Sequence, residues 1–252
     1  MVRGDDMDIT DWLLAACMGL AAAHYTSVGH AGASAYLALM ALFGVAPSVM
    51  RPTALALNVL VASLTSYRFH SAGLFRWRVL WPFLAGAAPS AFIGGVIELP
   101  GHYYRPIVGV VLLIGAAHFL WRSEPKSSHE IQDPPVLLGV LAGAGIGLLS
   151  GLTGIGGGIF LSPLILLAGW APVRTTSGVV AVFILCNSAA GLAGNIASVG
   201  SLPPNLPLFA GAVVLGALLG TTLGIRYFAP ETILKALGLV LIVAGLKLIG
   251  IY

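Results

Sequence analysis

Residues 147–172, which read GLLSGLTGIGGGIFLSPLILLAGWAP, decide the fold of this chain. Two apolar stretches flank the glycine-rich run from Gly154 to Gly158. Because glycine tolerates positive φ and leaves its backbone N–H uncovered, the run predicts a break between helices over 136–153 and 158–169. The second helix is too short to cross a hydrocarbon core, which takes about 20 residues. The segment therefore predicts a broken helix pair at membrane depth.

The composition of the whole chain is that of a protein surrounded by a lipid bilayer. Of its 252 residues, 58% are hydrophobic and only 8% are charged, whereas a soluble domain carries roughly 25% charged residues. The long apolar runs are continuous, which favours helices over the alternating strands of an outer-membrane barrel. The expected fold class is therefore an all-α polytopic protein of the cell inner membrane. A net charge of +3 without a basic stripe argues against a nucleic-acid partner.

Apolar runs between turn signals predict the helices, eight to ten in number depending on whether the short pairs span or re-enter. The segments cover residues 11–28, 33–45, 48–69, 79–98, 104–121, 136–153, 158–169, 173–195, 207–228 and 231–251. Two of them, 33–45 and 158–169, are short and follow glycine-rich sequence. The polar stretch 122–135, RSEPKSSHEIQDPP, predicts a cytoplasmic linker. It separates a first transmembrane repeat (1–121) from a second one (136–252).

The two halves match each other at an offset of 125 residues. Gly29 matches Gly154, and the GVAP sequence at 44–47 matches GWAP at 169–172. Further matches at this offset are Gly32 with Gly157 and Ser63 with Ser188. Each half holds one broken pair and three full spans, which together make a net crossing, so the second half is expected to be inverted. Inverted repeats with interrupted helices at matching positions are the architecture of many secondary transporters.

Lysine and arginine are distributed unequally over the loops, which predicts an orientation. Placing the loop 68–78 in the cytoplasm puts eight basic residues inside and four outside. The inside residues are Arg68, Arg76, Arg78, Arg122, Lys126, Arg174, Arg226 and Lys235. Both termini are then predicted to lie outside.

Residues 147–194 resemble the second-half signature of the TauE/SafE family of sulfite and organosulfonate exporters. The likeness rests on Gly154-Ile-Gly-Gly-Gly158, Pro163, the Thr-Ser pair 176–177 and the Asn-Ser pair 187–188. In the first half, VGHAGASAYLALMALFGVAP and ALNVLVASLTSYRFHSAG resemble the partner signature, with Gly29-His-Ala-Gly32 in place of the triple glycine. The resemblance covers nearly the whole chain. It implies a secondary transporter, most simply an exporter, of small sulfur-containing anions such as sulfite or organosulfonates.

The glycine runs are candidate anion-binding elements. A helix that begins directly after such a run presents free N–H groups and the positive end of its dipole, so an anion can bind there without a lysine. The candidate substrate-binding glycines are Gly29, Gly32, Gly154, Gly156, Gly157 and Gly158. The alternative interpretation is close helix packing through small residues.

Polar side chains inside the apolar runs are the remaining site candidates. They are His30, Asn58, Thr176, Ser177, Asn187 and Ser188. His30 would carry a proton and attract an anion, because imidazole titrates near neutral pH, and His24 is its candidate relay partner. The alternative for each side chain is a hydrogen bond to a neighbouring helix or to a backbone carbonyl.

Two arginines and several aromatic residues lie at predicted membrane boundaries. Arg51 and Arg174 either attract anions toward opposite mouths or act as snorkelling anchors. Tyr104 and Trp170 are among the aromatic residues expected to anchor the chain at the interface.

The sequence contains no constellation typical of an enzyme. It has no HExxH motif, no paired aspartates within the apolar segments and no Walker motif, so no enzyme activity, metal or cofactor is expected. The leading function is alternating-access transport of a small anion, and proton coupling through His30 is a further hypothesis. A passive anion channel is the alternative, and a membrane-embedded enzyme or assembly factor is a weaker third. The identity of the anion, the direction, the coupling ion and the choice between monomer and homodimer are left open.

Overall fold

The computed structural model describes residues 8–120, 132–199, 202–226 and 231–250. These residues form ten helices and no strand, which confirms the all-α prediction. The helices are α1 (Ile9–Ser27), α2 (Ala33–Leu42), α3 (Pro47–Ser71), α4 (Trp77–Val96), α5 (Gly101–Leu120), α6 (Val136–Thr153), α7 (Gly158–Leu167), α8 (Val173–Val199), α9 (Leu206–Arg226) and α10 (Glu231–Ile249). The predicted segments match them one to one, and the two short segments are α2 and α7.

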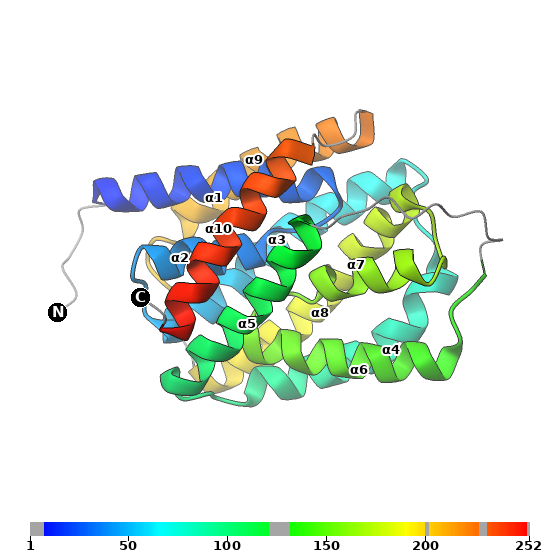
Figure 1. Cartoon of the computed structure of the whole chain (residues 1–252), viewed down its shortest axis with the longest axis horizontal. Helices are drawn as coiled ribbons and strands as arrows, with labels where there is room; N and C mark the ends of the chain where they lie inside the picture. The colour runs from blue at the N-terminus through cyan, green and yellow to red at the C-terminus, as the bar shows by residue number, and fades with distance from the viewer. Residues whose placement is uncertain (1–7, 121–131, 200–201, 227–230, 251–252) are drawn as a thin grey trace.

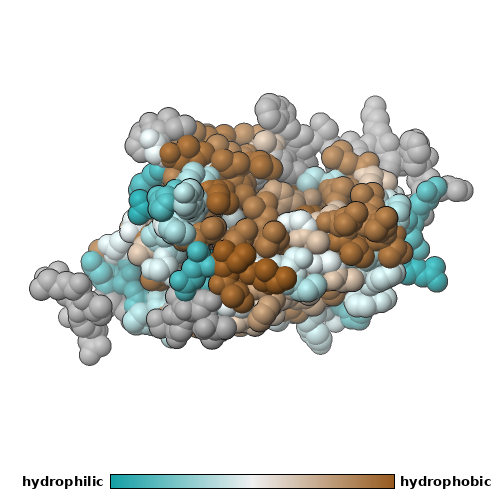
Figure 2. Space-filling view, turned by 90° about the horizontal axis from the view of Figure 1, so that it is seen from below, coloured by the Kyte–Doolittle hydropathy of each residue, from teal (hydrophilic) through white to brown (hydrophobic). Residues whose placement is uncertain are grey.

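The surface of the helix bundle is suited to a bilayer. Within the described residues, five helices are long and apolar enough to cross a membrane, namely α3, α4, α6, α8 and α9. On the face drawn in Figure 2, hydrophobic side chains extend across the middle of the molecule and hydrophilic ones gather toward its two ends. Leucines such as Leu137 and Leu219 are exposed on the bundle surface. A surface of this kind is stable when lipid, and not water, covers its apolar middle.

The helices of one half pack mainly on helices of the other half. α1 lies against α9 and α6 lies against α4, at opposite edges of the molecule in Figure 1. α5 packs on α10, and α3 packs on α8. If each helix of the first half is exchanged with its counterpart in the second half, the α1–α9 contact becomes the α6–α4 contact. The α5–α10 and α3–α8 contacts remain the same.

Glycines bring the backbones of these partner helices into contact. They recur at every fourth position on the face of α6 toward α4 and on the face of α9 toward α1. The glycines are Gly143, Gly147 and Gly151 on α6 and Gly216, Gly220 and Gly224 on α9. A Cβ at any of them would collide with a backbone carbonyl of the partner helix. Helices associate in this way in membranes, where close van der Waals contact replaces the hydrophobic effect.

The short helices lie inside the bundle, α2 beside α3 and α7 beside α8. In Figure 1, the hairpin of α1 and α2 opens toward one end of the molecule, and the hairpin of α6 and α7 opens toward the other end. α1 begins and α10 ends at the same end, opposite to the start of α6 (Figure 1). The interior is therefore formed by α3, α8 and the places where the two hairpins turn.

The interpretation of Arg51 as a snorkelling anchor is wrong, because its side chain is only 5% exposed. Its guanidinium donates to the carbonyls of Gly94, Gly95 and Ile97 at the end of α4. These bonds satisfy carbonyl groups that a helix end leaves without partners. Arg174 has the matching place in the second half and donates to the carbonyl of Ile225 near the end of α9, at 3.4 Å. Both arginines therefore stabilise the end of the fourth helix of their half.

Two of the aromatic residues predicted at the membrane boundary are buried, and part of the predicted linker lies outside the described residues. Tyr104 and Trp170 are only 3% and 7% exposed, so they are buried packing residues and not interface anchors. Most of the predicted linker, residues 122–131, lies outside the described residues, as do residues 1–7. Asp133, at its end, forms an ion pair with Arg76 at 3.1 Å.

Candidate functional site

Two non-helical breaks turn the hairpins and form the candidate site. The first break (residues 28–32) joins α1 to α2, and the second break (residues 154–157) joins α6 to α7. The residues that immediately precede α2 and α7, Gly32 and Gly157, have φ of 102° and 79°. Side chains with a Cβ rarely adopt such angles, so glycine lets the chain start a new helix directly after the turn.

The helices that follow the breaks begin with uncovered donors. In the described part of the chain, the backbone N–H groups of Ser34 and Ala35 in α2 have no hydrogen-bond acceptor, and neither have those of Gly158 and Ile159 in α7. Such groups carry the partial positive charge of the helix N-terminus. Both helix starts thus offer two donors each to an acceptor or an anion.

Asn58 of α3 joins the two breaks. Its Oδ1 accepts from the N–H of Ala33 at 3.1 Å, which caps the first turn of α2. Its Nδ2 donates to the carbonyl of Ile155 at 3.4 Å and to Oγ of Ser188 at 3.2 Å. The side chain is 1% exposed. One buried amide therefore contacts the start of α2, the second break and α8 at the same time.

His30 makes a second connection between the breaks. Its Nδ1 lies 3.2 Å from the carbonyl of Val28, and its Nε2 lies 3.2 Å from the carbonyl of Gly158 and 3.1 Å from Oγ of Ser162. In a neutral ring with its proton on Nδ1, Nδ1–H donates to the carbonyl of Val28 and Nε2 accepts from the Ser162 hydroxyl, whereas in the other tautomer Nε2–H donates to the carbonyl of Gly158. A protonated ring donates from both nitrogens. The contacts of His30 accommodate both protonation states.

Asn187 of α8 contacts the second break from its other side. Its Nδ2 donates to the carbonyl of Gly156 at 3.2 Å. Its Oδ1 is buried and has no partner among the described residues, although the side chain is 0% exposed. A Cβ on Gly157 would lie 3.1 Å from Nδ2 of Asn187. The second break is therefore enclosed by the amides of Asn58 and Asn187, with one amide oxygen still able to accept a hydrogen bond.

Other predicted site residues lie farther from these donors. The hydroxyls of Thr176 and Ser177 donate to carbonyls in and before the first turn of α8. The backbone of Ser177 is nevertheless the surface on which Gly29 packs, since a Cβ there would collide with it. Nδ1–H of His24 donates to the carbonyl of Leu20, one turn back in the same helix, at 2.7 Å.

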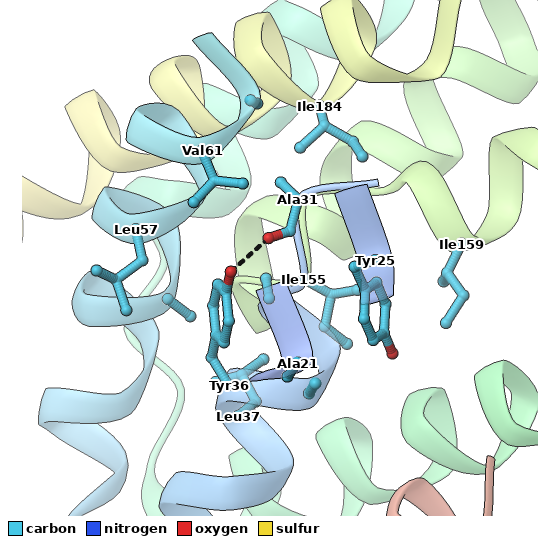
Figure 3. Close-up of a cluster of buried hydrophobic side chains, with 14 of the residues drawn as sticks. Ala21, Tyr25, Ala31, Tyr36, Leu37, Leu57, Val61, Ile155, Ile159 and Ile184 are labelled. Carbon is cyan, nitrogen blue, oxygen red and sulfur yellow. Dashed lines mark hydrogen bonds between the residues drawn. The ribbon is translucent and has the colours of Figure 1, made fainter. Parts of the chain in front are cut away.

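Two buried tyrosines hold the first break and were not anticipated from the sequence. Tyr36 donates its hydroxyl to the carbonyl of Ala31 at 2.6 Å, and Tyr25 shares a 2.7 Å hydrogen bond with Ser34. Figure 3 shows Ala31 of the first break close to Ile155 of the second, with the two tyrosine rings on either side. The sequence carried a signal, because a tyrosine inside an apolar run needs a partner for its hydroxyl.

The fold and the site together define a class of protein. Half-length helices that start at a buried polar centre, inside a bundle with an apolar surface, are typical of α-helical membrane transporters.

Comparison with known proteins agrees with this class. Residues 14–248 match the family model described as sulfite exporter TauE/SafE, and the chain belongs to that family. It is 39% identical over 228 residues to the probable membrane transporter protein y4hK of Sinorhizobium fredii (strain NBRC 101917 / NGR234), a match covering 89% of this chain and 92% of that protein. No solved structure gives a match. The chain is thus a multi-pass membrane transporter and not an enzyme, as the sequence predicted.

Proposed function

We propose that the protein is a secondary transporter that exports small sulfur-containing anions, such as sulfite or organosulfonates, by alternating access. The observation that carries the proposal is the meeting of two half-helix starts at one buried place. Asn58 contacts the start of α2 and the second break, and His30, in the first break, contacts the start of α7. Both of these helix starts have uncovered N–H groups. Neutral donors and helix dipoles attract an anion without holding it as tightly as a lysine would, so the anion is also released.

The proposal includes an inverted relation between the two halves. The hairpin of α1 and α2 and the hairpin of α6 and α7 open toward opposite ends of the molecule (Figure 1), which supports it. The exchange symmetry of the helix contacts supports it as well. An arrangement of this kind gives the two sides of the membrane equivalent routes to the same centre, which alternating access requires.

Proton coupling is the part of the proposal assigned to His30. When a neutral ring carries its proton on Nδ1, Nε2 accepts from Ser162, and when the ring gains a second proton, Nε2 donates to the carbonyl of Gly158. The added positive charge lies beside the start of α7, where it strengthens the attraction for an anion. Binding of a proton and binding of an anion would therefore favour each other.

Transport by purified protein in proteoliposomes tests the function. Radiolabelled sulfite, sulfate, thiosulfate, taurine and sulfoacetate are supplied in turn, with and without an imposed pH gradient. We expect accumulation of at least one sulfur oxyanion or sulfonate against its own gradient. Movement that only dissipates the gradient would identify a passive anion channel, and no movement of any of these solutes would contradict the proposal.

A further inference from the structure

A cavity of about 570 Å³ lies at one end of the molecule, where α3 begins and α4 ends. It is lined by Pro47, Ser48, Arg51, Pro52, Glu98, Leu99, Gly101, His102, Tyr104, Arg105 and Asn195. This end is opposite to the loop that joins α3 to α4 and to the start of α6. Several lining residues, including Ser48, His102 and Arg105, are exposed, so the cavity opens to the surface.

The charges of this cavity favour an anion. Arg51 and Arg105 outnumber the single carboxylate of Glu98, so the arginine and glutamate side chains give the lining a net positive charge. The cavity lining also includes two buried polar atoms that lack a hydrogen-bond partner among the described residues. Nε of Arg51 and Oδ1 of Asn195 are buried and have no hydrogen-bond partner in the described part of the chain. Both residues are at least nine-tenths buried, at 5% and 1% exposed. A buried N–H of a guanidinium without an acceptor is costly unless a solute supplies the acceptor.

The inner wall of the cavity touches the second break. The hydroxyl of Tyr104 donates to the carbonyl of Thr153, the last residue of α6, at 3.0 Å. A Cβ on Gly154 would lie 3.2 Å from the carbonyl oxygen of Arg51. The side chain of Tyr104 thus contacts the last residue of α6, and the backbone of Arg51 lies against Gly154, the first residue of the second break.

We propose that this cavity is a second anion site, a vestibule that binds a small oxyanion or sulfonate beside Arg51 and Arg105. Its role as the last station between the second break and the membrane surface rests on the proposed transport function, whereas the binding itself does not. Arg105 supplies a charge that can be removed without loss of the helix end that Arg51 stabilises. Glu98 opposes the anion, and its neutralisation should strengthen binding.

Protection of a cysteine in the vestibule tests the site without any transport. Ser48→Cys, in a background of Cys17→Ala and Cys186→Ala, introduces an isosteric thiol into the lining. The full-length protein in lipid nanodiscs is labelled with two methanethiosulfonate reagents, one with a sulfonate group and one with a quaternary ammonium group. Methanesulfonate is then titrated as an unreactive competitor. Ser71→Cys, an exposed serine at the opposite end of α3, is the matched control.

The expected result has three parts. Labelling at position 48 favours the anionic reagent and is slowed by methanesulfonate, whereas labelling at position 71 is not slowed. Arg105→Gln weakens the protection at least about fivefold, as removal of one nearby charge should, and Glu98→Gln strengthens it. Opposite effects of these two substitutions cannot arise from misfolding.

Two results would overturn the vestibule. One is labelling at position 48 that methanesulfonate does not slow, and the other is equal protection in the parent and Arg105→Gln proteins. Asn187→Ala tests the vestibule separately from transport, because the Asn187 amide lies at the second break and outside the vestibule lining; protection at position 48 should persist in this variant. If the parent protein shows protection but transports none of the anions in proteoliposomes, the vestibule stands and the proposed function is refuted.

Discussion

The two breaks occupy matching positions in the two halves but are stabilised in different ways. The first break contains His30 and is held by the hydroxyl of Tyr36 and by the amide of Asn58, which caps α2. The second break is almost bare glycine backbone and is held by amides from α3 and α8. Both helix starts offer backbone donors, but only the first break adds an ionisable side chain. We infer that both breaks take part in binding the anion and that the first break also senses the proton.

The largest effect should come from filling the second break. Gly157→Val adds a branched side chain at a φ of 79° and toward Ile146, Phe183 and Asn187. We expect anion binding and transport to fall by more than about 100-fold, because the N-terminus of α7 would be displaced or covered. Gly145→Val is the control, since nothing lies within 4 Å of a Cβ there. Both proteins are compared by transport and by size-exclusion chromatography, and equal anion binding would contradict the role of the second break.

The next largest difference is expected between the losses of stability on replacing Arg51 and Arg174, which stabilise the ends of α4 and α9. Arg51→Ala leaves three carbonyls without their donor, and each unpaired buried group costs about 1–3 kcal/mol. Arg174→Ala removes a long hydrogen bond from an exposed side chain and should cost about 0.5 kcal/mol or less. Thermal unfolding in detergent measures both losses. Similar losses of stability would contradict this prediction, because the ends of α4 and α9 would then depend equally on their arginines.

The two amides provide a finer comparison of the breaks. Asn58→Ala removes bonds to both breaks and to Ser188, with an expected loss of about 2 kcal/mol. Asn187→Ala removes one bond and also removes the unpaired Oδ1, so its cost should stay near or below about 1 kcal/mol. The same unfolding assay, combined with the transport assay, tests the order. A more damaging Asn187→Ala would place the centre of the site on α8 and not between the breaks.

A small effect on stability, but a specific effect on proton coupling, is expected at His30. His30→Gln keeps a side-chain amide near Val28 and Gly158 but cannot be protonated, so a cost of about 1 kcal/mol or less is expected. Accumulation driven by a pH gradient should disappear while downhill anion movement continues. His24→Gln is the control, because His24 bonds within its own helix. If the His30→Gln protein still responds to the pH gradient, the first break does not carry the proton.

Much of the fold could be predicted because it depends on local patterns. Apolar run length and the glycine run at 154–158 were sufficient to place the helices and both breaks. The contacts and burial of individual side chains could not be predicted as well. Ser63 and Ser188 are equivalent by offset, yet Ser63 is exposed and bonds to its own helix, while Ser188 is buried and accepts from Asn58. The offset says nothing about which face of each helix packs inward.

The burial of Arg51 also could not be predicted from the sequence. A single arginine near a span end is more often an exposed anchor. Its burial depends on the end of α4 lying within reach, which is a tertiary relation between positions 51 and 94–97. The role of Asn58 was closer to prediction, because an amide in an apolar run must find partners, but its contacts with both breaks required the three-dimensional arrangement.

The cross-packing of α1 on α9 and of α6 on α4 has a consequence for how such a molecule can move. We infer that close glycine-mediated backbone contact holds each of these helix pairs together as one unit, with one helix from each repeat. The units that move during transport would then not be the two repeats themselves. A chain severed between residues 120 and 132 should still assemble when both pieces are made in one cell, since each fragment presents the complementary surfaces that the other requires.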